Sequence, residues 1–220
     1  MSVATVHLVR HGEVHNPGGV LYGRLPHFGL SEKGHAMAGL VAEHFARRAD
    51  QGHRVARLVS SPLQRAQETA APISQALGLP VVTEDRVIEA WSRFQGLDKI
   101  AQRLRSPRHW PALRNPMRPS WGEPYADQVT RMAGAAKDHR DAALAEAGDG
   151  AEVIIVSHQL PIWVTRVASE RRSLALNSFR RECTLASVTS FTFADGVLTG
   201  VDYAEPAAEL LPGTVNIPGA

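Results

Sequence analysis

Cysteine is almost absent from this sequence of 220 residues, in which Cys183 is the only one. A single thiol excludes both an intrachain disulfide and a cysteine-rich zinc site. No apolar run approaches the length that crosses a bilayer. The first apolar run is interrupted by His7 and ends at Arg10, with no basic segment before it, which differs from a signal peptide. We therefore expect a cytoplasmic protein without a membrane partner.

An excess of charge of either sign is also lacking. The chain has 24 Lys and Arg residues against 22 Asp and Glu residues, a formal net charge of +2 at pH 7. This balance argues against a nucleic acid as the main partner, although it leaves room for a local basic pocket. The 10 histidines include no His-Glu-x-x-His motif, and no acidic cluster has the spacing of metal ligands. We therefore predict no metal site and no cofactor.

Short apolar runs alternate with helical patterns, which is typical of an α/β fold. Strands are predicted at residues 5–9, 57–60, 80–83, 151–156, 186–193 and 197–203. The last two flank Asp195-Gly196, a strong hairpin signal. Helices are predicted at residues 31–48, 62–77, 124–146 and from Pro161 onward. Ser31 and Ser61 are predicted N-caps, with Pro62 as the first helical residue after the second cap.

One domain is predicted over residues 1–205, followed by a loose tail at 206–220. Residues 91–124 are its least regular part and contain several prolines and arginines together with Trp91, Trp110 and Trp121. A long segment with so little periodicity is either a disordered linker or a functional element. The tryptophans favour packing, so we interpret 91–124 as a lid-like insertion; an irregular surface excursion is the alternative.

Basic side chains follow the predicted strands at their carboxyl ends, where ligands bind in open α/β sheets. Arg10 and His11 follow the first strand, His158 follows the strand at 151–156, and Arg65 lies in the first turn after the strand at 57–60. Positive neighbours keep an imidazole neutral, as a histidine that attacks phosphorus requires. Gly12 is expected to let an anion approach the backbone closely. The pattern predicts a phosphate pocket if these strands are neighbours.

Further short segments share one order with a known family. They are Leu8-Val9-Arg10-His11-Gly12-Glu13 with Asn16, Tyr22-Gly23-Arg24, Leu30-Ser31-Glu32-Lys33-Gly34, Ser60-Ser61-Pro62-Leu63-Gln64-Arg65-Ala66-Gln67-Glu68-Thr69-Ala70, Glu89, Gly122-Glu123 and Val156-Ser157-His158. In these segments the chain resembles the histidine phosphatase superfamily, also called the phosphoglycerate-mutase-like family. The resemblance covers most of the chain and implies a three-layer α/β/α sandwich with a mostly parallel central sheet.

The resemblance also implies a role for each matching residue. His11 would be the nucleophile that becomes a phosphohistidine, and Glu89 would be the proton donor. Arg10, Arg65 and His158 would bind the transferred phosphoryl group. The resemblance adds further phosphate-binding positions, namely Asn16, Arg24 and Gln159.

Some segments depart from the family pattern. After Glu89 the usual acidic-aromatic-Gly-x-Trp-Glu-Gly is replaced by Ala90-Trp91-Ser92-Arg93-Phe94-Gln95-Gly96. Glu84, Asp85 and Asp98 therefore stay open as alternative proton donors. Gly-Glu-Ser becomes Gly122-Glu123-Pro124, and Gln159 stands where a glycine often follows the second histidine. The Gln159 side chain is expected to narrow the pocket.

We predict a metal-independent phosphomonoesterase acting on a small phosphorylated metabolite. A cofactor-dependent phosphoglycerate mutase is one alternative, since it shares the phosphohistidine and residues 94–99 are faintly mutase-like. The phosphatase is favoured because the chain lacks the arginine-rich, tyrosine-containing segment and proline run of mutases. A non-catalytic phosphate-binding module is the second alternative, motivated by the departures around Glu89. The sequence leaves the oligomeric state open, with a homodimer as one option.

Overall fold

Strands and helices alternate through most of the chain, as the apolar pattern predicts. The computed structural model describes residues 2–98, 106, 121–174 and 181–214. Its strands are β1 (Val3–Arg10), β2 (Arg54–Ser60), β3 (Val81–Thr83), β4 (Ala151–Ser157), β5 (Val188–Ala194) and β6 (Val197–Ala204). Its helices are α1 (Glu32–Asp50), α2 (Gln64–Leu77), α4 (Tyr125–Ala147) and α5 (Gln159–Ser169), with the short 3-10 turns η1 (Asp85–Val87) and η3 (Ala208–Leu210).

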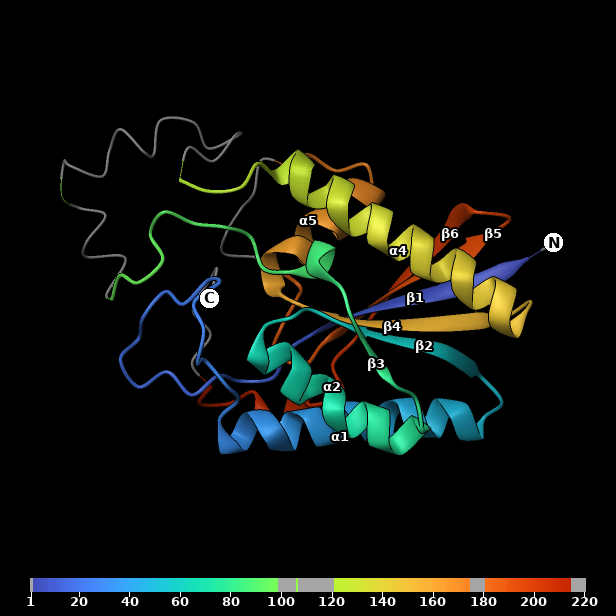
Figure 1. Cartoon of the computed structure of the whole chain (residues 1–220), viewed down its shortest axis with the longest axis horizontal. Coiled ribbons are helices and arrows are strands. Elements are labelled where there is room, and N and C mark those ends of the chain that lie inside the picture. Colours follow the sequence, from blue (N-terminus) through green and yellow to red (C-terminus); the bar gives the residue numbers. More distant parts are fainter. Residues whose placement is uncertain (1, 99–105, 107–120, 175–180, 215–220) are drawn as a thin grey trace.

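The strands form one six-stranded sheet in the order β3-β2-β4-β1-β5-β6. The pairs β3/β2, β2/β4 and β4/β1 are parallel, whereas β5 and β6 are antiparallel and close one edge. The predicted mostly parallel central sheet is confirmed. The expected hairpin is also present, and Asp195 and Gly196 both adopt positive φ at its turn, as the favoured two-residue turn requires. The parallel strands end on the side of the molecule that carries the long loops (Figure 1).

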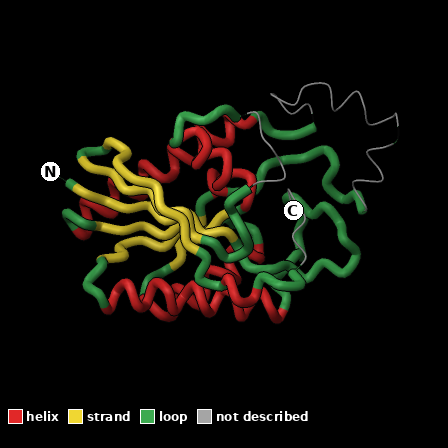
Figure 2. The backbone as a smooth tube through the Cα atoms, turned by 180° about the vertical axis from the view of Figure 1, so that it is seen from behind, coloured by secondary structure: helices red, strands yellow, loops and turns green. Residues whose placement is uncertain are grey.

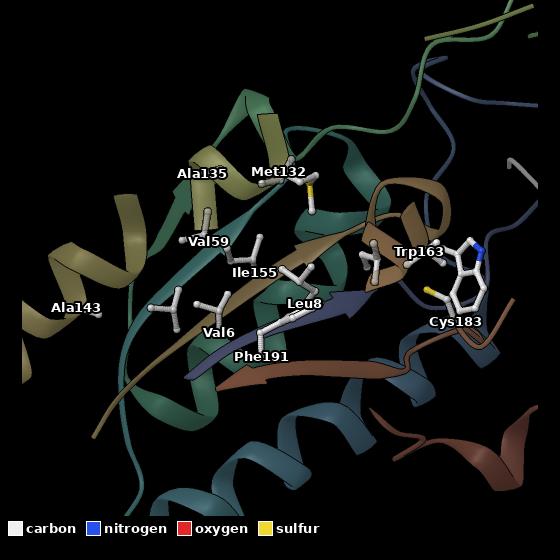
Figure 3. Close-up of a cluster of buried hydrophobic side chains, with 14 of the residues drawn as sticks. Val6, Leu8, Val59, Met132, Ala135, Ala143, Ile155, Trp163, Cys183 and Phe191 are labelled. Atoms are coloured by element: carbon white, nitrogen blue, oxygen red, sulfur yellow. The ribbon is translucent and has the colours of Figure 1, made fainter. Parts of the chain in front are cut away.

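Two apolar clusters hold the helices on opposite faces of the sheet. α1 and α2 pack on one face, with Val41, Phe45 and Ile73 fully buried there. α4 and α5 cover the other face (Figure 2), where Met132 lies over Ile155 and Trp163 lies beside Cys183 (Figure 3). These two layers confirm the predicted sandwich. No helix in the described part of the chain is long and apolar enough to cross a membrane.

The helix caps test the sequence signals one by one. Ser31 is the N-cap of α1, and its hydroxyl accepts a hydrogen bond from the backbone N–H of Gly34. The prediction for α2 was wrong, because this helix begins at Gln64 with Leu63 as N-cap. The hydroxyl of Ser61 lies instead 2.8 Å from Nε2 of His158. α5 begins at Gln159, so the proline at 161 falls in its first turn, where no intrahelical N–H is needed.

The predicted insertion and tail lie partly outside the described residues. Of 91–124, the structure describes 91–98, 106 and 121–124. Within these, Ser92 forms a bridge with Gly122, and Phe94 is buried. Of 206–220, it describes 206–214, where η3 forms and Ala207 is buried against the α1/α2 cluster. Leu210 and Leu211 also pack against this cluster, and the lid-like insertion and the loose tail stay predictions.

Two glycines of α1 give a matched pair of predictions. A Cβ at Gly34 would collide with the carbonyl oxygen of Glu13, whereas a Cβ at Gly39 would meet nothing within 4 Å. Gly34→Ala should therefore lower the free energy of unfolding by about 1–3 kcal/mol through overpacking. Gly39→Ala should raise it by about 0.5–1 kcal/mol, because alanine loses less backbone entropy in a helix. Urea unfolding of both variants checks this; equal effects would contradict the close packing at Gly34.

Candidate active site

Two histidines meet where neighbouring strands end. The parallel register of β1 and β4 pairs Arg10 with Ser157, so the next residues, His11 and His158, leave the sheet side by side. Their ring centroids are 5.2 Å apart, with 58° between the ring planes. Both side chains are fully buried. The sheet therefore brings together two imidazoles that are far apart in the sequence.

His11 is held in one tautomer. Its Nδ1 lies 2.8 Å from the carbonyl oxygen of Gly12, and because a carbonyl only accepts, Nδ1 carries the proton. Nε2 is buried and has no hydrogen-bond partner in the described structure. Burial, and then the positive charges of Arg65 and Arg10, hold the pKa of His11 well below its ordinary value. His11 is thus a neutral imidazole whose Nε2 keeps its lone pair.

His158 presents its other nitrogen. Its Nε2 lies 2.8 Å from the hydroxyl of Ser61, which also accepts a long 3.4 Å contact from the N–H of Leu63. When the hydroxyl donates to Nε2, the ring proton lies on Nδ1. Nδ1 is buried without a partner among the described groups. Burial and the charge of Arg65 also lower the pKa of His158. In the tautomer with the proton on Nδ1, this ring offers an N–H donor at the sheet edge.

Two buried guanidinium groups complete this cluster. Arg10 ends β1 and Arg65 lies in the first turn of α2, and each is 1% exposed. Arg10 donates to the carbonyl of Cys183 at 2.8 Å. Arg65 donates to the carbonyl of Gly23 at 2.7 Å and lies over the ring of Tyr22. Buried guanidinium groups are suited to binding an anion, because an anion compensates a charge that water cannot reach.

Gly12 serves packing as well as the site. A Cβ there would lie 2.5 Å from the carbonyl oxygen of Gly34 at the start of α1. The sequence predicted this glycine as a means for an anion to approach the backbone. The structure gives a different reason, since the loop after β1 packs directly on α1 at this residue. That packing fixes the carbonyl that orients His11.

Glu89 is the buried carboxyl group of the site. It is 1% exposed; Oε1 accepts from the N–H of Ala90 at 2.7 Å, and Oε2 has no partner in the described part of the chain. Burial raises its pKa, although Arg65, Arg10 and Arg131 oppose the rise. A carboxyl group whose pKa is raised by burial is suited to general acid catalysis.

The alternative proton donors are placed differently. Glu84 forms ion pairs with Arg86 and His139, and hydrogen bonds from Arg86 lower its pKa to about 2. It is therefore ionised at neutral pH and has no proton to give. Asp85 begins η1, and Asp98 forms a backbone bridge with Val20. Burial raises the pKa of Glu89, whereas hydrogen bonds from Arg86 lower the pKa of Glu84.

The remaining predicted phosphate ligands are engaged with protein groups. The amide of Asn16 exchanges two hydrogen bonds with the backbone of Val20. Arg24 donates to the carbonyl of Glu89 and pairs with Glu123. Gln159 donates to the carbonyl of Cys183. Phosphate binding by Asn16, Arg24 and Gln159 stays a prediction.

Sequence reasoning missed two groups at the site. Ser61 was interpreted only as a helix cap, although its position directly after β2 indicated the same edge of the sheet. Arg181, for which the sequence gives no motif or periodicity, donates to Oε1 of Gln159 at 3.2 Å. Its Nε is buried without a partner in the described structure. Its charge acts on Glu89 and Arg10, so it lies near the reacting groups.

No group of three or more His, Cys, Asp or Glu side chains in the described ranges could hold a metal ion. An apolar groove of about 400 Å³ lies away from the histidines, against α4, α5 and the β5/β6 edge, and is lined by residues such as Ala133, Thr165 and Phe193. The titratable groups described above are not part of its lining. The chemistry is therefore concentrated at the ends of the parallel strands.

This sandwich, whose parallel strands end in two neighbouring histidines, two buried arginines and a buried carboxyl group, has the groups that phosphoryl transfer requires. The family model of the histidine phosphatase superfamily (branch 1) matches residues 6–205. The chain belongs to this superfamily, and its similarity to a phosphoserine phosphatase supports its assignment as a phosphatase.

Relatives and solved structures agree with this assignment. The chain is 47% identical over 205 residues to the uncharacterized protein Rv0525 of Mycobacterium tuberculosis, covering 92% of this chain and 96% of that protein. It is 31% identical over 160 residues to phosphoserine phosphatase 1 of Hydrogenobacter thermophilus, covering 70% of this chain and 71% of that protein. The native structure of the mycobacterial glucosyl-3-phosphoglycerate phosphatase Rv2419c shares the fold, with a TM-score of 0.68, 24% identity, and 86% and 90% of the two chains covered.

Proposed function

We propose that this phosphatase hydrolyses a small phosphorylated metabolite through a phosphohistidine at His11, without a metal ion. The observation that carries the proposal is the tautomer of His11, whose Nδ1–H is bound to the Gly12 carbonyl while Nε2 is left unpartnered between buried arginines. A phosphoryl group needs a nucleophile with a free lone pair and fixed positive charge around its oxygens. His11, Arg10 and Arg65 supply both.

In the first step, Nε2 of His11 attacks phosphorus while the bond to the ester oxygen breaks. The guanidinium groups of Arg10 and Arg65 and the Nδ1–H of His158 bind the equatorial oxygens, where the charge of the transition state is spread. Protonated Glu89 gives its proton to the departing oxygen, so the alcohol leaves uncharged. The products of this step are the alcohol, the phosphohistidine and ionised Glu89.

In the second step, water replaces the alcohol. The Glu89 carboxylate takes a proton from the water as its oxygen attacks phosphorus. The bond between phosphorus and Nε2 breaks, and its electron pair returns to His11. Inorganic phosphate leaves, and His11 and Glu89 regain their starting protonation states. Because the arginines carry the compensating charge in both steps, the scheme needs no metal ion.

The substrate class is supported by a cation beyond the phosphoryl cluster. One relative is a phosphoserine phosphatase, and one solved structure of the same fold is a glucosyl-3-phosphoglycerate phosphatase. Both names refer to phosphomonoesters that also carry a carboxylate. In this chain, Arg181 lies near Glu89 with a buried, unpartnered Nε. A guanidinium group in that position suits a carboxylate next to the phosphate. We therefore propose carboxylate-bearing phosphomonoesters as the first substrates to assay.

Replacing Glu89 by glutamine tests the general acid. Glu89→Gln should slow the release of a poor alkyl leaving group about 100-fold or more, because that oxygen needs a proton as it departs. An aryl phosphate with an acidic phenol should lose less than about tenfold, because it needs little protonation. Single-turnover release of alcohol from phosphoserine and from p-nitrophenyl phosphate measures the difference. Glu43→Gln, on the exposed face of α1, is the control, and equal losses on both esters would point to another acid.

An isomerisation assay on the unmodified protein distinguishes a phosphatase from a mutase. With bisphosphoglycerate present, a mutase converts 3-phosphoglycerate to 2-phosphoglycerate before water reaches the phosphohistidine. We expect phosphate release to exceed this isomerisation. Isomerisation faster than phosphate release would contradict the proposed hydrolase.

A further inference from the structure

Glu89 lies on backbone that no helix or strand supports. The segment between η1 and Ser92 has irregular structure, and side chains from two distant elements hold it instead. Arg24 donates through Nε to the carbonyl of Glu89 at 2.6 Å. Arg131 of α4 donates through Nη1 to the carbonyl of Arg86 at 2.6 Å. The backbone that carries Glu89 is thus tied at both ends by guanidinium groups.

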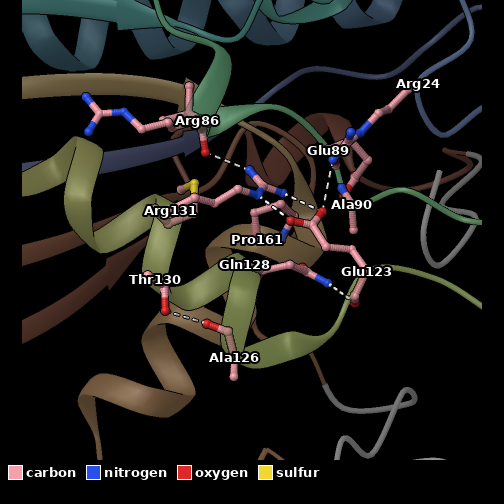
Figure 4. A network of polar contacts seen from close by, with 12 residues as sticks. Arg24, Arg86, Glu89, Ala90, Glu123, Ala126, Gln128, Thr130, Arg131 and Pro161 are labelled. Carbon is pink, nitrogen blue, oxygen red and sulfur yellow. Dashed lines mark hydrogen bonds and ion pairs between the residues drawn. The ribbon is translucent and has the colours of Figure 1, made fainter. Parts of the chain in front are cut away.

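Glu123 joins these two arginines (Figure 4). Its Oε1 accepts from Nε of Arg131 at 2.6 Å and its Oε2 from Nη2 of Arg131 at 3.1 Å. The same Oε2 accepts from Nη2 of Arg24 at 2.9 Å. The side chain is 16% exposed, so water does little to weaken these contacts.

Backbone contacts fix Glu123 in turn. Its N–H donates to the carbonyl of Trp91 at 2.9 Å, next to the bridge between Ser92 and Gly122. The side chain of Gln128, which is fully buried, donates to the carbonyl of Glu123 at 2.9 Å. Hydrogen bonds therefore fix both the N–H and the carbonyl of Glu123. The position of Glu123 in turn orients the two arginines that bind its carboxylate.

We propose that Glu123 is a positioning residue for the general acid: it orients Arg24 and Arg131, and they hold the backbone that aims the Glu89 carboxyl group at the leaving oxygen. This inference rests on the proposed function, in which Glu89 is that acid. A second consequence is electrostatic. Arg131 lowers the pKa of Glu89, and the charge of Glu123 offsets both arginines, so the acid keeps its proton to higher pH.

Ionisable groups from several described elements act on the charge of Glu89. Groups on several elements face its carboxyl group, namely Arg10 on β1, Tyr22 and Arg24 on the following loop, Arg65 on α2, Arg131 on α4, and Arg181 and Cys183 before β5. All of these arginines favour the ionised form. Glu123 reaches two of them, so its loss should lower the pKa of Glu89.

The test replaces Glu123 by glutamine, which keeps its size and removes its charge. Glu123→Gln should slow alkyl ester cleavage about tenfold, because small misplacements of a reacting group are costly, with KM changed less than about twofold. Cleavage of p-nitrophenyl phosphate should change less than the alkyl ester reaction. Activity that requires protonated Glu89 is lost as pH rises through its pKa, so the basic limb of kcat/KM should move to lower pH. Single-turnover rates and pH profiles on both esters provide the measurement.

Glu170 offers a matched control. It also bridges two arginines, Arg166 and Arg172, and is 23% exposed, but it lies at the end of α5. Glu170→Gln should leave the leaving-group dependence and the basic limb unchanged. Glu123→Asp keeps the charge while shortening the side chain. The basic limb of its kcat/KM profile should therefore lie at the same pH as in the unmodified protein, and its rate of alkyl ester cleavage should fall only in part.

The outcomes separate the two proposals. If Glu89→Gln shows no leaving-group dependence, Glu89 is not the acid and the proposed function fails at that residue. If Glu89→Gln shows the leaving-group dependence, and Glu123→Gln has the same rates and pH profile as Glu170→Gln, only the positioning role of Glu123 is overturned. Should Glu123→Gln fail to fold, Arg24→Gln removes one tether, and its alkyl rate should still fall more than its aryl rate; an equal fall on both esters would overturn the inference.

Discussion

Replacing His11 by alanine is expected to lower turnover of p-nitrophenyl phosphate by about 10⁴-fold or more, because the covalent route is lost with the nucleophile. The neutral tautomer of His11 is the reason for so large an effect. Its Nδ1 is bound to the Gly12 carbonyl, and its buried Nε2 has no hydrogen-bond partner in the described structure. Steady-state rates of highly purified protein give the measurement.

His158→Ala should cost less, about 10²–10³-fold, since it removes one donor to the transition state and leaves the nucleophile. His35→Ala is the control, because His35 is exposed on α1 and should not affect turnover. A His11→Ala variant with a tenth of normal activity would exclude His11 as the nucleophile. Full inactivity of the unmodified protein on all phosphomonoesters would instead favour a phosphate-binding module.

Arg65→Met should produce two opposite effects of large size. Turnover should fall by about 10³-fold, as when an arginine that neutralises a phosphoryl transition state is removed. The free energy of unfolding should rise by about 1–3 kcal/mol, because an apolar side chain replaces a buried charge. Arg65 is 1% exposed and its Nε finds no acceptor in the described structure. In the proposed function, this guanidinium group serves the reaction at the expense of stability.

Thermal unfolding with and without inorganic phosphate checks this pair of effects. Phosphate should raise the Tm of the unmodified protein by binding the native state, and Arg65→Met should lose most of this gain while starting from a higher Tm. Arg47→Met is a matched control, since Arg47 is 63% exposed on α1. A lower Tm for Arg65→Met, with the phosphate effect intact, would show that Arg65 supports the fold rather than the anion.

Much of the site was predictable because strand ends are predictable. Apolar runs located β1 and β4, and parallel strands present their carboxyl ends at one edge of a sheet. His11 and His158 therefore had to lie at that edge, and the β1/β4 pairing then made them neighbours. Arg65 was correctly placed in the first turn of its helix although the cap was wrong, since the shift from Pro62 to Gln64 is less than one turn.

Contacts between side chains from unrelated segments could not be predicted. The ion pairs of Glu123 with Arg24 and Arg131 depend on how a loop, the bridge between Ser92 and Gly122, and α4 pack together. Hydrophobic periodicity does not predict such packing. Ser61 is a second example. A serine before a proline is typical of a helix N-cap, but the hydroxyl of Ser61 forms a hydrogen bond with the imidazole of His158 instead. The proposal of Glu89 over Glu84 as proton donor depends on burial, which raises the pKa of Glu89, and on hydrogen bonds from Arg86, which lower the pKa of Glu84.

Trapping the phosphoenzyme tests the central claim most directly. The protein is mixed with a substrate labelled on phosphorus and denatured in alkali within one turnover, because a phosphohistidine survives alkali and is lost in acid. Peptide mapping should place an alkali-stable, acid-labile label on His11 and none on His11→Ala. Turnover without a label, or a label on His158 or another residue, would contradict nucleophilic attack by Nε2 of His11.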